Sequence, residues 1–519
     1  MARGEAKSSG GATQTPGGGL PLERFTRLPA YPWLVVGTVC VGAFMAALDA
    51  SIVNIALPDI QAGFHVGINS VGWVAIAYLL TLTSLVVLFG RISDMVGRRT
   101  VYSTGFTVFI IGSALSGAAP SFAVLIGARV MQAVGAGMLQ ANSVAIVTAA
   151  APPGQRGRAI GIQAAFQAIG LALGPTIGGL LVSIASWRAI FYVNVPVGII
   201  GTLAGILILP QDHVVKRAVQ ASAQEIQKKM GLDVPGATLL ALALVGVMFS
   251  LTQGSTMGWT APPVLIGLGV FVFAGLAVVL WEGRAKSALI DPALLKIRIF
   301  VMGNLTGLLT YSITFGTLFL IPYELRRAFL MGPAIAGVLL TAVPLSMMAV
   351  SPFAGGLSDR FGPQKLTIVG TILMGIGTAG LGLLGYTGSP YALVPAMLVV
   401  GVGMGLFTPP NNSSVMGSVP SNQLGTTGGV LNMARSLGMS FGNAVAATLF
   451  PLFLLIYGGV GRTLVPSVNL AAARDAFGGL FLLSVLALML SLGRSAGFET
   501  PGQRETSGKD EAAIHVVEW

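Results

Sequence analysis

Charged residues are scarce in this chain: Asp, Glu, Lys and Arg make up 9% of its 519 residues, whereas 54% are hydrophobic. A water-soluble domain carries roughly 25% charged residues, so the composition excludes a chain that folds in water alone. We therefore expect a protein of the lipid bilayer. One cysteine and three histidines leave no intrachain disulfide and no zinc-site spacing. No P-loop string occurs either, and we expect no cofactor.

The net charge of +11 does not indicate a nucleic-acid partner, because the basic residues are unevenly distributed between loops. With the amino terminus placed in the cytosol, most Lys and Arg fall in inner segments, as the positive-inside rule describes. The outer loops then hold only Arg188, Arg326, Arg327, Arg462 and Arg474. The distribution predicts a multi-pass protein with both termini in the cytosol.

Long apolar runs dominate the sequence, most of them near the ~20 residues that cross a bilayer as a helix. They are continuously apolar rather than alternating, which excludes an outer-membrane barrel. The runs are 34–57, 71–90, 100–119, 122–150, 159–185, 190–210, 235–252, 262–281, 300–323, 333–354, 367–386, 391–410, 425–456 and 476–493. Pro58 is expected to end the first helix. The chain is thus predicted to be an all-α integral membrane protein with about fourteen transmembrane helices.

The apolar runs are grouped six, two and six, and this grouping predicts the domains. We expect two six-helix bundles with two inserted helices between them. The predicted boundaries are 1–33 for a disordered cytosolic segment, 34–210 for the first bundle, 211–299 for cytosolic connectors and the inserted helices, 300–493 for the second bundle and 494–519 for a cytosolic tail.

A short charged loop occurs twice, at Gly90–Gly97 and at Gly355–Gly362. Its recurrence predicts that two homologous helical halves have been joined, as in many secondary transporters. The simplest role of its charges is to anchor helix ends at the membrane surface. The repeated acids Asp94 and Asp359, with basic neighbours such as Arg98, also predict a charge-based latch between helices in one of two conformational states.

Asp49 is the only acidic residue deep inside an apolar run, about 15 residues into the first one. A charged side chain at mid-helix costs roughly 2.5–3.5 kcal/mol to insert, so it has to face a cavity or a partner. Two interpretations stay open: a proton or cation site, and a buried polar link between helices. Asn54, five residues further on, is a second candidate for the same site.

Arg129 is the matching cation, about seven residues inside the fourth run. Gln132 lies on the same helix face one turn further on, which favours a lined cavity. The alternative is an arginine that extends its charged end to the membrane surface. If Asp49 and Arg129 lie within reach, then substrate, proton and arginine can compete for one charge, which is the minimum requirement for antiport.

The fifth run contains a glycine-rich string. Gly170, Gly174 and Gly178 recur every four residues, so they line one helix face and permit close packing against another helix. Pro175 removes a backbone hydrogen bond and can bend the helix. Gly179 ends the string.

Glu324 follows a proline at the outer end of the ninth run. We expect it to be an interfacial residue paired with Arg326 and Arg327, and a transport carboxylate is the alternative. Other polar residues of the later runs could line the second half of a cavity. These are Asn304, Tyr311, Asn411, Asn412, Asn432 and Arg435.

Together these strings resemble the major facilitator superfamily and, within it, the 14-span drug:proton antiporters. Gly90–Arg99 resembles the superfamily's signature loop between spans 2 and 3. Arg129–Gly137 resembles the fourth-span motif whose arginine is implicated in proton transfer, and Gly170–Gly179 is similar to the antiporter motif of the fifth span. Leu48–Pro58 and Trp187–Gly198 are similar to strings characteristic of the 14-span exporters.

The resemblance implies the superfamily's fold and the export of lipophilic, often cationic, compounds from a bacterial inner membrane, driven by inward proton flow. We expect Asp49 to release its proton when a lipophilic cation binds from the cytosol, and to be reprotonated from outside as the cargo leaves. The implied partners are lipophilic small molecules, protons and the bilayer, and a monomer is expected. Alternatives are export of a lipid, peptide or endogenous natural product, and a membrane enzyme or receptor, for which no catalytic constellation is present.

Overall fold

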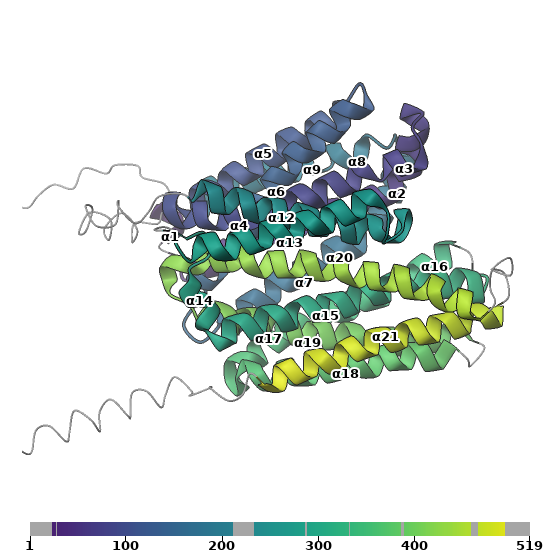
Figure 1. Cartoon of the computed structure of the whole chain (residues 1–519). Coiled ribbons are helices and arrows are strands. Elements are labelled where there is room, and N and C mark those ends of the chain that lie inside the picture. The colour runs from purple at the N-terminus through teal and green to yellow at the C-terminus, as the bar shows by residue number, and fades with distance from the viewer. Residues whose placement is uncertain are drawn as a thin grey trace, which may run out of the picture.

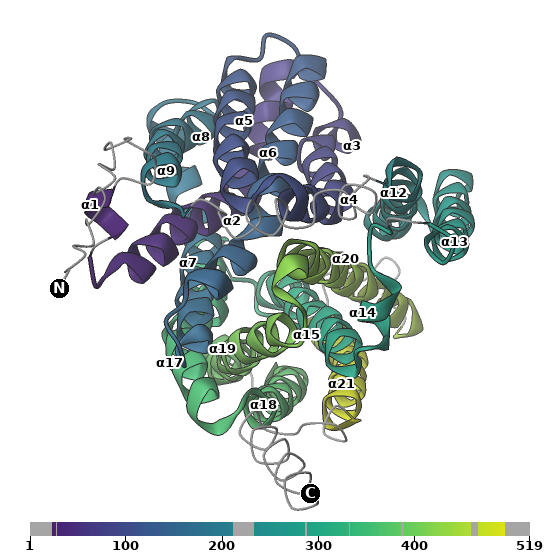
Figure 2. The same cartoon turned by 90° about the vertical axis from the view of Figure 1, so that its left-hand side faces the viewer.

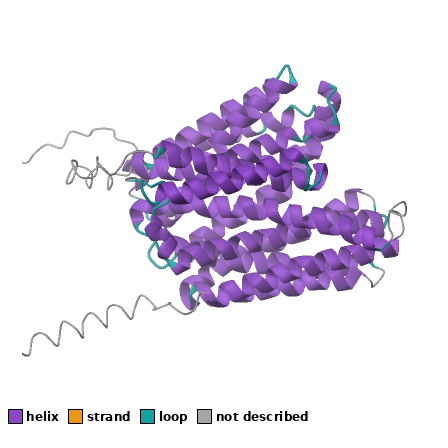
Figure 3. Ribbon diagram, viewed as in Figure 1, coloured by secondary structure: helices purple, strands orange, loops and turns teal. Residues whose placement is uncertain are grey.

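The computed structural model describes residues 23–26, 28–210, 233–285, 288–331, 333–385, 389–457 and 466–493. Within these ranges every regular element is a helix (Figure 3). Thirteen spans are long and apolar enough to cross a membrane, and the bent helix α7 makes a fourteenth. The prediction of an all-α membrane protein with about fourteen transmembrane helices is confirmed.

The first bundle contains six spans, in which helix α2 packs along α7 and α5 packs along α6 (Figure 1). The short helices α1 and α3 flank α2, and α8 and α9 together form the sixth span. The bounds are α1 Glu23–Thr26, α2 Tyr31–Phe64, α3 Ile68–Val71, α4 Trp73–Val96, α5 Arg98–Ala118, α6 Phe122–Ala150, α7 Arg156–Ile184, α8 Ala189–Tyr192 and α9 Asn194–Ile208.

The second bundle repeats this arrangement, and Figure 2 shows it beside the first, with α20 and α7 between them. Its first span is followed by a π-helical turn, η1. The bounds are α15 Arg298–Tyr323, η1 Glu324–Ala328, α16 Pro333–Leu340, α17 Ala342–Phe361, α18 Pro363–Leu384, η3 Pro390–Ala392, α19 Leu393–Gly417, η4 Ser421–Gln423, α20 Leu424–Ile456 and α21 Pro466–Gly493.

The two inserted helices, α12 (Val234–Met257) and α13 (Pro262–Glu282), form a hairpin that is followed by the short helix α14 (Pro292–Lys296). Helix α12 contacts both α4 of the first bundle and α20 of the second. At the tip of the hairpin, Trp259 Nε1 donates a hydrogen bond of 2.9 Å to Thr448 Oγ1 of α20. The hairpin therefore covers one side of the seam between the bundles (Figure 2).

The first helix differs from its predicted bounds. It begins at Tyr31 rather than residue 34 and continues through Pro58 to Phe64. The expectation that Pro58 ends it is wrong, because neighbouring helices in a membrane bundle can satisfy the backbone group that a proline frees. Most of 1–33, the connector 211–232 and the tail 494–519 lie outside the described residues.

Buried apolar side chains join the two bundles at one end. One hydrophobic cluster extends from Val39 and Phe106 of the first bundle to Leu424 and Val430 of α20. A separate cluster, which includes Leu320 and Phe450, lies within the second bundle. The bundles are thus packed together where α4 ends and α20 begins, which we call the latch end, and the opposite end is called the far end.

Candidate functional site

Asp94, in the first copy of the repeated loop, holds the beginning of α20 in the other bundle. Its Oδ1 accepts a hydrogen bond of 2.9 Å from the backbone N–H of Gly425, and its Oδ2 accepts one of 2.8 Å from that of Thr426. Arg98 donates to Asp94 Oδ1 at 3.2 Å and to the backbone oxygen of Ser421 at 2.6 Å. A carboxylate is favourable here because the first amides of a helix have no partner within the helix and carry its positive dipole end.

Asp359, in the second copy, makes the equivalent contact with α7. Its two carboxylate oxygens accept hydrogen bonds from the backbone N–H groups of Gly157 at 2.8 Å and Arg158 at 3.0 Å. The turn after each acid contains a glycine in the left-handed region, Gly97 with φ 106° and Gly362 with φ 82°, where other residues are strained. The repeat in the sequence thus forms two matching latches.

The latches differ from the prediction in their partners. The sequence predicted charge pairing between neighbouring helices, which Asp94 makes with Arg98 of α5, but each acid also binds the N-terminal amides of a helix from the opposite bundle. Gly90 and Gly355 permit the approach, since a Cβ on either would collide with the backbone of Gly425 or Gly157, respectively. The latch end is therefore held closed, whereas the ribbons of the two bundles diverge towards the far end (Figure 1).

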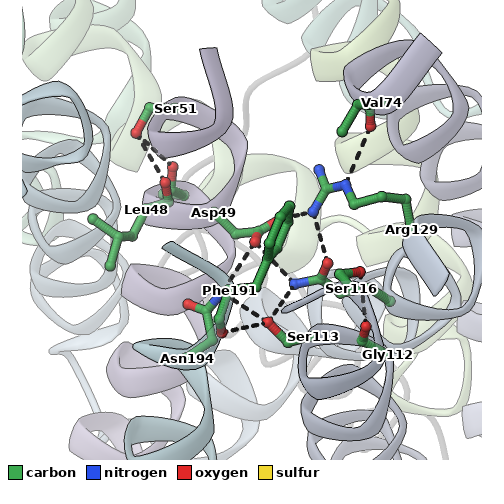
Figure 4. A network of polar contacts seen from close by, with 12 residues as sticks. Leu48, Asp49, Ser51, Val74, Gly112, Ser113, Ser116, Arg129, Phe191 and Asn194 are labelled. Atoms are coloured by element: carbon green, nitrogen blue, oxygen red, sulfur yellow. Dashed lines mark hydrogen bonds and ion pairs between the residues drawn. The ribbon is translucent and has the colours of Figure 1, made fainter. Parts of the chain in front are cut away.

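Asp49 and Arg129 form a buried ion pair inside the first bundle (Figure 4). Arg129 Nη1 lies 2.8 Å from Asp49 Oδ2, and Arg129 Nε donates to the backbone oxygen of Val74 at 3.2 Å. The guanidinium carbon lies 4.2 Å from the ring centroid of Tyr78, a cation–π contact. The two charges that the sequence analysis selected, 80 residues apart, are thus brought together.

Three neutral side chains complete the network around the carboxylate. Gln132 Nε2 donates to Asp49 Oδ1 at 2.9 Å, and Asn194 Nδ2 donates to the same oxygen at 3.0 Å. Ser113 Oγ accepts from both amides at 3.1 Å and donates to the backbone oxygen of Phe191 at 2.8 Å. The carboxylate is therefore solvated by side chains of α6 and α9, and Ser113 of α5 links the two amides.

Burial decides what this site can do in the observed state. The side chains of Asp49 and Arg129 are 0% and 1% exposed, and both carboxylate oxygens are occupied. The interpretation that Arg129 extends its charged end to the membrane surface is therefore excluded. The expectation that cargo binds directly against Asp49 is not met in this state, because the network leaves the carboxylate no free face. A proton, by contrast, needs only one oxygen and would cancel the charge that holds Arg129.

The glycine string of α7 packs against α2, the helix that carries Asp49. A Cβ added to Gly178 would lie 2.6 Å from Cγ2 of Ile55, and one added to Gly170 or Gly174 would collide with α2 as well. Gly179 faces away, with nothing within 4 Å of an added Cβ. All three glycines of the predicted close-packing face, Gly170, Gly174 and Gly178, thus lie against α2, and they position the Asp49 segment.

Pro175 lies at the bend of α7, where the segments Arg156–Gly174 and Thr176–Ile184 meet at 41°. Asn54 lies on α2, between Asp49 and the end of that helix. The side chains of Pro175 and Asn54 fall outside the described part of the structure.

Glu324 is placed differently from the expectation. It begins the π-helical turn that follows the span α15, and its side chain is 2% exposed. Among the described residues its Oε2 has no hydrogen-bond partner, and Oε1 lies against Gly385 at the end of α18. The side chains of Arg326 and Arg327, the predicted partners, lie outside the described part of the structure. Burial raises the pKa of the Glu324 carboxyl to about 8. The side chain of Glu324 thus faces the inside of the second bundle, towards α18 and α21, and not the membrane interface as expected.

The polar residues of the second bundle mostly bind backbone oxygens. Asn304 donates to its own helix, and Asn411 donates to Gly303 of α15. Asn432 reaches across the seam to the backbone oxygen of Gln140 at 2.8 Å. These amides tie helices together, whereas Arg435, one turn beyond Asn432, lies over the ring of Tyr311.

Sequence reasoning missed Ser113 and Asn194 as members of the Asp49 network. Ser113 is one of many small hydroxyl residues in the apolar runs, so nothing in the sequence distinguishes it. Asn194 carried a signal, since an amide inside an apolar run needs a partner just as Asp49 does. It lies within the string Trp187–Gly198, whose resemblance to exporter sequences was noted above.

Two repeated six-helix bundles, joined by paired latches at one end and diverging at the other, define a membrane transporter. The family model of the Major Facilitator Superfamily matches residues 39–443, and the chain belongs to this superfamily. It is therefore a transporter and not an enzyme.

Similar proteins from bacteria include transporters of more than one kind. The chain is 34% identical over 419 residues to the riboflavin transporter RibZ of Clostridioides difficile, which covers 80% of this chain and 88% of RibZ. It is 32% identical over 416 residues to the multidrug resistance protein Stp of Mycobacterium tuberculosis, covering 80% of this chain and 75% of Stp. The crystal structure of the human organic anion transporter MFSD10 shares the fold, with a TM-score of 0.61 at 17% identity over 90% of this chain and 100% of that chain.

Proposed function

We propose that this protein exports small lipophilic compounds in exchange for protons, by alternating access between its two bundles. The observation that carries the proposal is the buried Asp49–Arg129 pair, whose partners come from four helices of one bundle. A single proton on Asp49 removes the charge that orders all of them. The naming of Stp as a multidrug resistance protein supports this choice of cargo.

In the proposed cycle, the observed state has a closed latch end and an intact ion pair, which is the arrangement before proton loading. A proton entering from the far end neutralises Asp49 and frees Arg129. Because Asp49 lies on α2, whose close contact with α7 depends on Gly170, Gly174 and Gly178, a change in the network is transmitted to α7 and to its latch with Asp359. Coupling is thus indirect, through helix packing, and cargo occupies the space between the bundles.

The energy available is sufficient. One proton crossing a ~100 mV potential releases about 2.3 kcal/mol, and a gradient of one pH unit adds about 1.4 kcal/mol. The sum sustains a concentration ratio of a few hundred for a neutral cargo exchanged one for one. No bound cofactor is required, since the proton gradient is the energy source.

We further propose that the protein lies in the inner membrane of a bacterium, with both termini and the latch end in the cytosol. The bacterial source of the similar proteins supports the inner membrane. The positive-inside distribution of Lys and Arg supports the orientation of the termini. The proposed partners are lipophilic cargo, protons and lipid, with no nucleic acid, and the functional unit is a monomer.

A second candidate function is transport of a metabolite or natural product made by the cell itself. Its specific support is the similarity to RibZ, which is named as a riboflavin transporter. Both candidates use the same coupling site, so they are separated by cargo and not by mechanism.

The test is Asp49→Asn in proteoliposomes with an imposed pH gradient. We expect proton-coupled export of every cargo to be lost, because asparagine cannot be ionised, while the protein stays folded since asparagine preserves the shape. Asp59→Asn, an exposed acid on the same helix, is the matched control and should retain transport. Coupled export by the Asp49 variant at the unmodified protein's rate would refute the proposal.

A further inference from the structure

Arg435 is an isolated cation in the middle of the second bundle. It lies on α20, about 16 Å along the helix axis from Leu424 at 1.5 Å per residue. Half the thickness of a bilayer core is about 15 Å, so the residue is close to mid-membrane depth. Its side chain is partly exposed, unlike that of Arg129, which is fully enclosed.

The surroundings of Arg435 contain a ring and no carboxylate. The guanidinium carbon lies 5.4 Å from the ring centroid of Tyr311 on α15. Among the residues that the structure describes, no acidic side chain lies within ion-pair distance of it. The acids on helices packed against α20 are engaged elsewhere, Asp94 with the beginning of α20 and Asp475 with Arg474 and Tyr457.

Arg435 lies on α20 between the side that packs against α15, through Gly438 and Gly442, and the side that meets the first bundle. Asn432, three residues earlier on α20, donates across the seam to Gln140 of α6, and residues three apart lie on nearly the same face of a helix. Beyond this point the ribbons of the bundles diverge (Figure 1). Arg435 therefore lies close to the seam between the bundles, about one turn from a residue that reaches across it.

An unpaired arginine at this depth is unfavourable unless something anionic meets it during the working cycle. We infer that Arg435 and Tyr311 form a binding site for a planar aromatic cargo that bears an acidic group, so that the transported compounds include lipophilic organic anions. The inference rests on the proposed export function and names its cargo class. The guanidinium binds the acidic group through paired hydrogen bonds. The Tyr311 ring, which is 8% exposed, positions the guanidinium through the cation–π contact, and the aromatic part of the cargo lies beside this pair.

This assignment changes the charge balance of transport. When an anion leaves in exchange for an entering proton, both movements carry positive charge inward, so a membrane potential that is negative inside drives both. A cationic cargo exchanged for one proton moves no net charge. The cargo class is therefore visible in the dependence of transport on membrane potential, independently of affinity.

The experiment uses the full-length protein in proteoliposomes of zwitterionic lipid, with two dyes of the same ring skeleton: fluorescein, an anion, and a cationic rhodamine ester. We expect proton-coupled export of fluorescein that is accelerated by an inside-negative potential. Arg435→Gln should reduce fluorescein export by about tenfold or more, the effect of losing a charge-assisted hydrogen bond, and leave rhodamine export within about twofold. Arg298→Gln, an exposed arginine on α15, is the matched control.

The outcomes separate the two proposals. If neither dye is exported with protons by the unmodified protein, the proposed function fails. If coupled export occurs but Arg435→Gln leaves fluorescein export unchanged, only the cargo assignment is overturned. If added anionic lipid abolishes the effect of Arg435→Gln, the site binds lipid headgroups and the assignment is overturned too. Should Arg435→Gln not fold, Arg435→Lys serves instead, and we expect weaker fluorescein binding to the purified protein with unchanged binding of the rhodamine.

Discussion

At the scale of single residues, two arginines inside membrane-spanning helices show how pairing distinguishes a structural charge from one that can bind a ligand. Arg129 is enclosed by Asp49, Gln132 and a backbone oxygen, so its charge is compensated within the bundle. Among the residues that the structure describes, Arg435 contacts the Tyr311 ring and no carboxylate. A proton on Asp49 changes the Asp49–Arg129 pair, whereas the guanidinium of Arg435 is available to an anionic ligand.

Glu324 gives a prediction for stability against pH. Its folded-state pKa of about 8 lies above the ordinary value for Glu, so between these two values the folded protein retains a proton that the unfolded chain releases. The free energy of unfolding should therefore fall as the pH rises through this window, by up to about 1.4 kcal/mol per unit.

Glu324→Gln removes this fall in the free energy of unfolding with rising pH, because glutamine cannot be ionised. Above about pH 8 the thermal midpoint of the variant should therefore be higher than that of the unmodified protein. The measurement is thermal unfolding in detergent across the window, with Asp475→Asn, which removes an acid from the neighbouring helix α21, as the control. Parallel pH profiles for the unmodified protein and Glu324→Gln would show that the carboxyl is not buried as described.

At the scale of elements, the contact between α2 and α7 links the proton site to the latch. Glycines on one face of α7 let the helix axes approach, and small residues in this pattern are how membrane helices gain packing contacts. The string is thus a structural requirement of coupling and not a binding site.

The paired glycines of α7 provide an internal comparison. Gly174→Ala introduces a Cβ that collides with α2, and we expect it to cost about 1–3 kcal/mol of stability through overpacking. Gly179→Ala meets nothing within 4 Å and should be neutral or stabilising, because alanine is the better helix former by about 1 kcal/mol. Thermal midpoints and transport rates of the two variants check this, and equal effects would contradict the assigned packing face.

At the scale of the whole molecule, the two latches and the hydrophobic cluster at α20 favour a closed latch end. The inserted hairpin contacts both bundles and is bonded to α20 at its tip through Trp259. It covers one side of the seam, and the hairpin leaves the opposite side, where α7 meets α17, uncovered (Figure 2).

Loss of both latch acids should shift the conformational balance. Asp94→Asn together with Asp359→Asn weakens two charge-assisted contacts to helix N-termini, each worth roughly 0.3–1 kcal/mol or somewhat more when buried. We expect the population with an open latch end to rise by roughly tenfold. Spin labels at Val96 and Phe361 report the latch end.

A second label pair, at Ile184 and Tyr391, reports the far end. The latch-end distance should lengthen and the far-end distance should shorten in the double variant. Cys40 is the only native cysteine and is buried, so one substitution provides a labelling background. Unchanged distance distributions at both ends would rule out the latches as conformational determinants.

Much of this could be predicted because the determining patterns are local. Continuous apolar runs identified the helices, although a proline did not end α2, since other helices can supply hydrogen-bond partners to it. Asp49 and Arg129 stood out because charge at membrane depth is costly and requires a partner. Partners without charge, such as Ser113 and Asn194, carried little or no distinguishing signal.

By itself, the sequence determined the membrane environment, the number of spans, the duplication of the bundle and the two charges that have to meet, because each follows from hydrophobicity, spacing or the cost of burying charge. Only the tertiary structure decided that each latch acid binds a helix N-terminus of the opposite bundle, that Glu324 turns inward, and that no carboxylate of the described residues pairs with Arg435. These are relations between segments hundreds of residues apart, and packing of whole helices, not local composition, brings such segments together.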